Sequence, residues 1–135
     1  MNYAKIESLL RRLISETNSG CRVWLPVSAE DLDAEKNSAL YYLLFQNEYH
    51  RVDFESTYKL HFANGWFYLV REWAESGRDG TIFDGLNLYV QTAPGASITR
   101  LASDTAQLYG LKIAIEEQQE LPKDVSDFVD SFLES

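Results

Sequence analysis

Two stretches near the ends of the chain carry apolar residues at the spacing of an amphipathic helix. The first stripe has offsets of 0, 3, 4, 7 and 8 and consists of Ile6, Leu9, Leu10, Leu13 and Ile14. Gly20 follows it, and glycine accepts the left-handed turn that often ends a helix, so we expect a helix from about residue 3 to 18. The same offsets recur in Val125, Phe128, Val129, Phe132 and Leu133. Pro122 precedes this second stripe, as is favourable at a helix start, and the pattern predicts a closing helix.

The centre of the chain changes to the alternation that is typical of strands. Apolar residues alternate with polar ones over 50–54 and 86–91, and residues 22–25 form a short β-prone run before Pro26. Residues 58–62 and 66–73 flank Asn64-Gly65, a pair that fits the two-residue loop of a type I′ turn. We therefore predict an aromatic-rich β-hairpin with further strands beside it.

Two segments between these elements are harder to interpret. Ser28, with acidic residues after it, predicts the start of a helix that runs toward Asn47, although Asn37-Ser38 would also allow an acidic loop and a shorter helix. Ser103 is a suitable cap for a short helix that Gly110 closes. The alternation of residues 111–116 then predicts a last strand.

These elements predict an α+β fold, in which an antiparallel sheet of four to five strands carries amphipathic N- and C-terminal helices packed on it. Helices and strands do not alternate regularly, as a parallel βαβ sheet would require. The chain has 135 residues and 45% hydrophobic content, enough for one core, so we expect residues 1–135 to form a single domain.

Charge and cysteine content narrow the expected partners and compartment. Twenty-one acidic and 12 basic residues give a net charge of −9, which would repel nucleic acid. The ends differ, because residues 1–22 are mainly basic and residues 101–135 mainly acidic. A single cysteine, Cys21, suggests a reducing, cytoplasmic environment. Arg11 and Arg12 interrupt the apolar N-terminal stretch, unlike a signal peptide, and we expect no membrane segment.

Candidate catalytic chemistry is sparse in this sequence. One cysteine with His50 and His61 supplies too few ligands for structural zinc, so neither a metal nor another cofactor is expected. His50 and His61 would form an acid–base site with Asp53 only if their strands brought them together. Residues 76–80 lack the pattern of a phosphate-binding loop. We therefore predict no catalytic residues, and an enzyme is the less favoured interpretation.

The predicted hairpin is apolar on both faces, which a small domain has difficulty covering. An aromatic ring that stays exposed lacks several kcal/mol of the stabilisation that burial would provide, at about 25 cal/mol per Å² of apolar surface. The second face should therefore meet a helix of the same chain, a second subunit or a partner. Six residues are candidates for partner binding, from the hairpin and from the acidic outer face of the last helix: Trp66, Tyr68, Arg71, Trp73, Asp124 and Asp127.

Two hypotheses for function follow from these patterns. The first is a non-enzymatic acidic protein-binding module, such as an inhibitor, an immunity-type protein or a chaperone-like adaptor. Its partner would be a protein, basic in charge, and a homodimer is also compatible with the apolar excess. The alternative is a small-molecule-binding or hydrolytic domain with a pocket between sheet and helices, to which Tyr58, Arg71 and the histidines would contribute polar groups.

Overall fold

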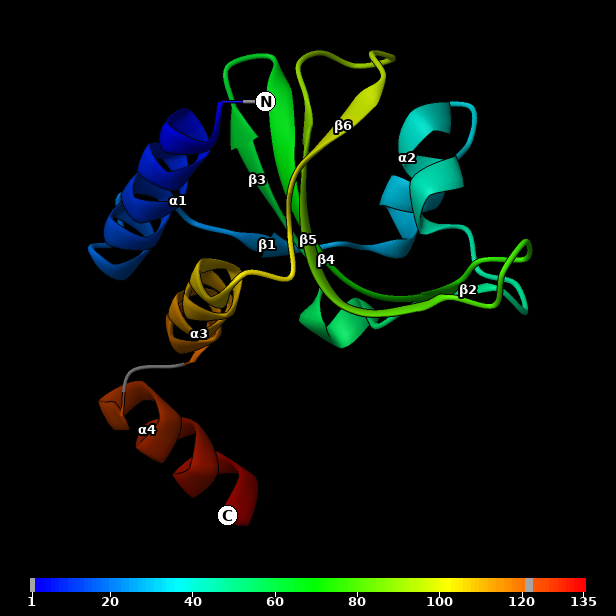
Figure 1. Cartoon of the computed structure of the whole chain (residues 1–135). Coiled ribbons are helices and arrows are strands. Elements are labelled where there is room, and N and C mark those ends of the chain that lie inside the picture. Colours follow the sequence, from blue (N-terminus) through cyan, green and yellow to red (C-terminus); the bar gives the residue numbers. More distant parts are fainter. Residues whose placement is uncertain (1, 121–122) are drawn as a thin grey trace.

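The computed structural model describes residues 2–120 and 123–135 and confirms the α+β class (Figure 1). Within these residues there are four α-helices, one six-stranded antiparallel sheet and two short 3-10 turns. The helices are α1 (Tyr3–Asn18), α2 (Ser38–Leu44), α3 (Ala106–Gln119) and α4 (Lys123–Glu134), and the 3-10 turns span Ala29–Leu32 and Phe54–Ser56. The strands are β1 (Leu25–Pro26), β2 (His50–Val52), β3 (Tyr58–Phe62), β4 (Gly65–Glu75), β5 (Ile82–Gln91) and β6 (Ile98–Ser103).

The sheet is built around the long antiparallel pair β4 and β5. Its strand order is β1-β3-β4-β5-β6, and β2 pairs with the far half of β4. β4 and β5 curve strongly in Figure 1, so that the half next to β3 faces α1 and α3, while the half next to β2 lies below α2. The sheet has six strands rather than the expected four to five, because sequence alternation did not reveal β6. The weak strand expected at 22–25 is β1, which is shifted to Leu25–Pro26.

The hairpin is confirmed, but its loop is shifted by one residue. Phe62 pairs with Gly65, so the loop consists of Ala63 and Asn64 rather than of Asn64 and Gly65. Ala63 has a φ of 53°, whereas Asn64 does not have a positive φ, and a type I′ turn needs positive values at both positions. Gly65 is instead required by packing, since a Cβ there would overlap the main-chain oxygen of Gln91.

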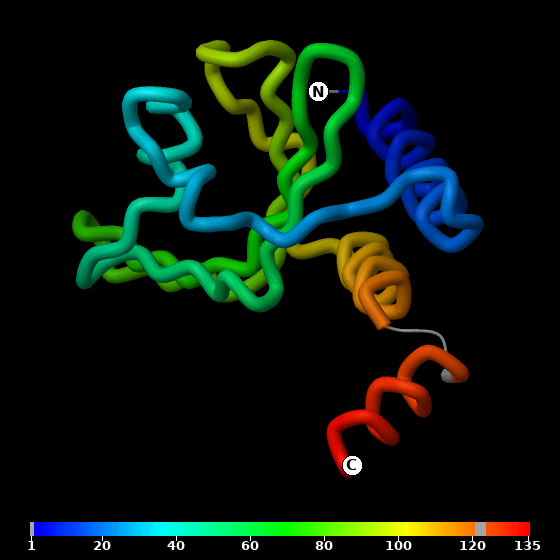
Figure 2. The backbone as a smooth tube through the Cα atoms, turned by 180° about the vertical axis from the view of Figure 1, so that it is seen from behind, coloured from blue at the N-terminus to red at the C-terminus, as the bar shows by residue number. Residues whose placement is uncertain are grey.

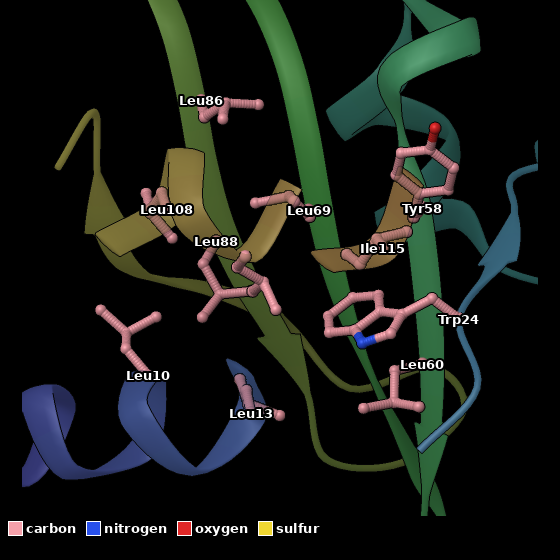
Figure 3. Close-up of a cluster of buried hydrophobic side chains, with 11 residues drawn as sticks. Leu10, Leu13, Trp24, Tyr58, Leu60, Leu69, Leu86, Leu88, Leu108 and Ile115 are labelled. Atoms are coloured by element: carbon pink, nitrogen blue, oxygen red, sulfur yellow. The ribbon is translucent and has the colours of Figure 1, made fainter. Parts of the chain in front are cut away.

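Both faces of the central strands are covered by the chain itself. One cluster lies between the sheet, α1 and α3 and is shown in Figure 3; it contains Leu10, Leu13, Trp24, Tyr58, Leu60, Leu69, Leu86, Leu88, Leu108, Leu111 and Ile115. The other lies on the opposite face, against α2, and contains Val27, Leu40, Leu44, Val52, Tyr68, Val70 and Tyr89. Figure 2 shows the segment after α1 crossing the sheet toward α2, and it carries Trp24 into the first cluster. The two hydrophobic cores therefore lie on opposite faces of the same sheet.

The predicted last strand is wrong, because residues 106–119 form one helix. Thr105 rather than Ser103 caps it, and Gly110 lies within it rather than at its end. The buried residues Leu108, Leu111 and Ile115 recur at helical spacing, whereas Ile113 is 56% exposed. The alternation of Leu111, Ile113 and Ile115 is thus incidental to the true helical face.

Two interpretations were left open for segment 28–47. The structure has the second of them, a loop followed by a shorter helix. Ser28 and Asp31 form a capping box that starts only the short 3-10 turn. α2 begins at Ser38, five residues after Asp33, the C-cap of that turn. Its own N-cap is Asn37, whose side chain accepts a hydrogen bond from the Leu40 amide. Asn37 is held from outside the segment, since its amide group exchanges hydrogen bonds of 2.9 Å with Gln91 on β5.

The two terminal helices differ in how they are covered. α1 is confirmed at 3–18 and packs on the first cluster through Leu10 and Leu13. α4 is confirmed as a helix, but its apolar face is exposed rather than packed on the sheet, and in Figure 1 it stands apart from the strands below α3. Pro122, expected at its start, lies outside the described residues. Among those that are described, no helix is both long and apolar enough to cross a membrane.

Candidate functional site

The tip of the β3–β4 hairpin exposes aromatic surface beside α1. Phe62 is 55% exposed although it is large and apolar, and His61 next to it stacks on the ring of Trp66 with centroids 4.5 Å apart. Lys59 Nζ lies 5.1 Å from the centroid of the same indole. The tip therefore combines partly exposed rings with a lysine whose charge is paired with Asp31 at 2.7 Å.

A groove runs between α1 and this hairpin, and we call it the hairpin groove. It is lined by Leu9, Arg12, Leu13, Glu16, Arg22, Leu60, Phe62 and Phe67 and has a volume of about 150 Å³. Arg22 crosses it, with the guanidinium carbon 5.3 Å from the centre of the Phe62 ring. The groove is smaller than the roughly 300–1,000 Å³ of a typical small-molecule site, and its floor is mainly apolar.

The rim of the hairpin groove is positive in a chain that is otherwise acidic. Arg12 Nε lies 2.8 Å from Glu16 Oε2, and Arg22 Nε lies 3.5 Å from Glu16 Oε1. The single carboxylate of Glu16 thus pairs with the guanidinium groups of both Arg12 and Arg22. The groove rim therefore retains a net positive charge. This reversal of the overall charge favours acidic ligands at the groove.

The exposed face of α4 is the second candidate surface. Phe128 and Phe132 are 76% and 74% exposed. They share one side of the helix with the further exposed residues Val125, Val129 and Leu133. Asp124 and Asp127, two of the predicted partner-binding residues, are exposed on the same helix and accompany Asp130. α4 is therefore an amphipathic helix with an uncovered apolar face and an acidic polar face.

The four partner-binding candidates on β4 do not form one patch. Trp66 and Tyr68 lie on the α2 side of the sheet, while Arg71 and Trp73 alternate onto the other side near the opposite end of the strand. Trp66 and Trp73 are half-buried, and Tyr68 is only 2% exposed. Burial raises the pKa of Tyr68 to about 12, and its hydroxyl donates to Gln91 at 3.1 Å. Tyr68 thus belongs to the core rather than to a contact surface in this structure.

Arg71 is also engaged within the chain. Its guanidinium forms an ion pair with Asp84 on β5, and this hydrogen bond raises the pKa of Arg71. Trp73 lines a nearby surface hollow of about 310 Å³ together with Arg71 and Asp84. These residues join β4 to β5 at the end of the sheet that is far from the hairpin groove.

A buried polar network surrounds Glu72 on the α2 side of the sheet. Glu72 Oε1 lies 2.9 Å from His50 Nε2, and Glu72 Oε2 accepts hydrogen bonds from Asn87 Nδ2 at 3.0 Å and from Tyr89 at 2.6 Å. Burial, strengthened by the bond to Glu72, raises the pKa of Tyr89. A carboxylate beside a histidine is the kind of pair that acid–base catalysis uses.

The Glu72 side chain is nevertheless almost fully buried, at 7% exposed. The hollow of about 310 Å³ is lined by Glu72, but His50, Asn87 and Tyr89 do not contribute to its walls. The carboxylate has three hydrogen-bond partners on β2 and β5, of which Asn87 and Tyr89 are buried and His50 is half-buried. A network of this type fixes the positions of β2, β4 and β5 relative to one another.

The strands do not bring the two histidines together, which was the condition for an acid–base site. His50 pairs with Ala74 and His61 with Trp66, which lie eight residues apart on β4. At about 3.3 Å per strand residue the two positions are roughly 26 Å apart along β4. Across residues 2–120 and 123–135, no group of three or more histidine, cysteine or acidic side chains is arranged to hold a metal ion.

Sequence reasoning missed the residues that line the hairpin groove. Leu9 and Leu13 were expected only as a core stripe, and Phe62 only as part of the hairpin. Arg12 and Arg22 belong to the basic N-terminal region, and this charge asymmetry was the one signal that could have pointed to them. Their convergence depends on the crossing of α1 over the hairpin, which local patterns do not encode.

The comparisons with known proteins give no external guide to this site. Searches against protein-family models, curated proteins and solved structures found no match to the chain.

Proposed function

We propose that the protein is a non-enzymatic protein-binding module that makes contact through the hairpin groove and α4. The observation that carries this proposal is the apolar face of α4, where Phe128 and Phe132 are each about three-quarters exposed. Single apolar residues at a surface are ordinary, but five on one helical face form a contiguous patch. Patches of this kind mark interaction sites in soluble proteins.

The chemistry of α4 also indicates the kind of ligand. Apolar residues at offsets of 0, 3, 4, 7 and 8 match the anchors of a helix that docks in an apolar groove. The acidic residues Asp124, Asp127 and Asp130 would meet basic side chains at the rim of that groove. Anionic membranes and nucleic acids fit poorly, because both would face this acidic side.

The polar chemistry elsewhere supports binding rather than catalysis. Glu72 and His50 form the most catalysis-like pair, but their hydrogen bond joins β2 to β4, and the Glu72 side chain is only 7% exposed. A protein-binding module needs a stable sheet with exposed anchors, and the arrangement around β4 supplies such a scaffold. Inhibitors, immunity-type proteins and chaperone-like adaptors belong to this class of function.

The proposal is tested by capture from an extract of cells that produce the protein. Full-length chain and the variant Phe128→Ala/Phe132→Ala are immobilised, and bound proteins are quantified by mass spectrometry. We expect at least about a tenfold loss of the specific partner with the variant, because two buried aromatic anchors commonly contribute several kcal/mol to binding. Tyr42→Ala is the matched control, since Tyr42 is 74% exposed on α2, away from both surfaces.

Equal capture by the wild type and by the Phe128→Ala/Phe132→Ala variant would contradict the proposal for α4. Circular dichroism of each variant shows whether the fold is retained, and retention is expected because both phenylalanines are exposed.

A small-molecule site is the second candidate function, and one cavity favours it. A hollow of about 470 Å³ lies between α1 and β6, within the size range of ligand pockets. Its walls include Ile6, Leu10 and Leu101, with Glu7 and Arg100 as charged groups.

A thermal-shift screen of metabolites tests whether this hollow binds a small molecule, and a stabilising compound should lose its effect in Arg100→Ala. Tyr58, Arg71, His50 and His61, the polar groups first expected in a pocket, do not line this hollow.

A further inference from the structure

We propose that the partner of α4 is a second copy of this chain, whose hairpin groove receives the helix. Two copies would thus exchange their α4 helices reciprocally and form a symmetric dimer. This inference rests on the proposed function, because it names the ligand of the same two surfaces.

The helix and the groove are complementary in polarity. α4 presents two phenylalanines with smaller apolar residues around them, and the hairpin groove presents leucine and phenylalanine side chains. Phe62 is 55% exposed at the groove and Phe128 is 76% exposed on the helix, so both surfaces would gain from mutual burial.

The helix and the groove are also complementary in charge. Over its described residues the polar side of α4 carries Asp124, Asp127, Asp130 and Glu134. The groove rim carries Arg12 and Arg22 with only Glu16 between them. In a chain of net charge −9, a positive rim around an apolar groove is a local exception, and it matches an acidic amphipathic helix.

Charge also argues against direct pairing of two α4 helices. In such a pair the apolar faces would meet, and Asp124 and Asp130, the acidic residues nearest the edges of the apolar stripe, would approach their counterparts on the other helix. Like charges that face each other across an interface destabilise it. Docking of each helix in an arginine-rimmed groove avoids this repulsion.

The contact area would lie near the lower limit for a stable dimer. The four phenylalanines of two exchanged helices, about three-quarters exposed at present, would bury on the order of 600 Å². The groove surfaces that cover them would bury a similar area. The sum approaches the roughly 1,200 Å² at which specific, stable interfaces begin.

The first experiment measures the mass of the full chain by light scattering and sedimentation equilibrium over a range of concentrations. We expect a dimer for the wild type and for Tyr42→Ala. Phe128→Ala/Phe132→Ala should weaken dimerisation by at least about tenfold, since it removes the anchors from both exchanged helices. A wild type that stays monomeric at all concentrations would overturn the inference.

The second experiment reverses charge on each surface separately. Arg12→Glu/Arg22→Glu reverses the groove, and Asp124→Arg/Asp130→Arg reverses the acidic residues nearest the apolar stripe of the helix, so each variant alone should be monomeric. An equimolar mixture should form a heterodimer, because the acidic helix of the first then meets the basic groove of the second, and the basic helix meets the acidic groove. A mixture that stays monomeric would contradict the pairing of these two surfaces.

The outcomes separate this inference from the proposed function. A monomer that still captures another protein through Phe128 and Phe132 would overturn the second copy as ligand and retain the binding module. A monomer whose own α4 fills its own hairpin groove would also overturn the exchange. A dimer that persists in Phe128→Ala/Phe132→Ala and in both charge-reversal variants would exclude α4 from the interface.

Discussion

At the scale of single residues, the structure is held by polar contacts that join segments far apart in the sequence. Trp24 illustrates this, because its indole is fully buried and donates to Thr17 at 3.0 Å, while its amide donates to Gln118 on α3 at 2.8 Å. These bonds attach the segment after α1 to both long helices. Buried donors that are satisfied in this way contribute to a unique packing arrangement.

Tyr89 offers a test of the Glu72 network as a structural element. Tyr89→Phe removes the hydroxyl that donates to Glu72 at 2.6 Å and leaves one carboxylate oxygen with a bond fewer. We expect the free energy of unfolding to fall by about 1–3 kcal/mol, the cost of an under-satisfied buried polar group. Chemical denaturation measures it. Tyr42→Phe, at an exposed ring, should change it by less than about 0.5 kcal/mol; an equal loss in both variants would contradict a special role for the network.

Asp31 gives the chain a predicted sensitivity to acid. Burial alone would raise its pKa, but hydrogen bonds from Lys59 at 2.7 and 2.9 Å and from Ser28 hold it below the ordinary value of 3.8. Because the folded-state pKa is the lower one, the stabilisation is present above pH 3.8 and is lost as the pH falls through the folded-state pKa.

Asp31→Asn should therefore destabilise the protein by about 1 kcal/mol at neutral pH, because solvent partly screens this half-buried ion pair, and the difference from wild type should shrink in strong acid. Denaturation curves at several pH values measure this. Glu30→Gln is the matched control, because it removes an exposed carboxylate from the same 3-10 turn and should have little effect at any pH. A difference between Asp31→Asn and wild type that is independent of pH would show that the ion pair is not its cause.

At the scale of secondary structure elements, the orientation of α3 decides how the first core is filled. Leu108, Leu111 and Ile115 are fully buried, and the helix packs beside α1 where Gly110 comes close to Ile14. In a strand, Ile113 and Ile115 would share a face, whereas in a helix they point in different directions. The two isoleucines therefore distinguish the observed helix from the strand that alternation predicted.

Ile115→Ala should reduce the free energy of unfolding by about 2–5 kcal/mol, because it leaves a cavity in the first cluster. Ile113→Ala, the same change at a position that is 56% exposed, should cost less than about 1 kcal/mol. Urea denaturation of both variants measures the difference. Similar losses at the two positions would be incompatible with the helical register of α3.

At the scale of the whole molecule, the curved β4–β5 pair unites two cores into one unit. Leu69 belongs to the α1 and α3 side, and its neighbour Val70 belongs to the α2 side. Damage to either core must therefore disturb the strands that the other core needs. We expect one cooperative unfolding transition, as a single domain requires.

The matched pair Leu69→Ala and Val70→Ala tests this expectation. Each variant should lower the midpoint of one shared transition, observed equally by far-ultraviolet circular dichroism and by tryptophan fluorescence. Trp24 reports from the first cluster, and Trp66 packs against the second. Two separate transitions in either variant would mean that the two cores unfold independently.

Several features of this protein were determined by its sequence alone. Stripes such as Ile6 to Ile14, and alternation such as residues 86–91, predict helices and strands correctly because they express local geometry. The amphipathic character of α4 follows in the same way from Phe128 and Phe132. These predictions depend only on residues that are near neighbours along the chain, and they were sufficient for the α+β class.

Other features were decided only by the tertiary structure. The position of α4 relative to the sheet decides whether its apolar face is buried or exposed. Hydrophobic periodicity predicts only that the helix has one apolar face. The hairpin loop moved by one residue because Gly65 must approach Gln91 closely, a contact between strands that is invisible in the local sequence. The hairpin groove likewise exists only because α1 and the hairpin bring Arg12, Arg22 and Phe62 together, since long-range packing sets which side chains share a surface.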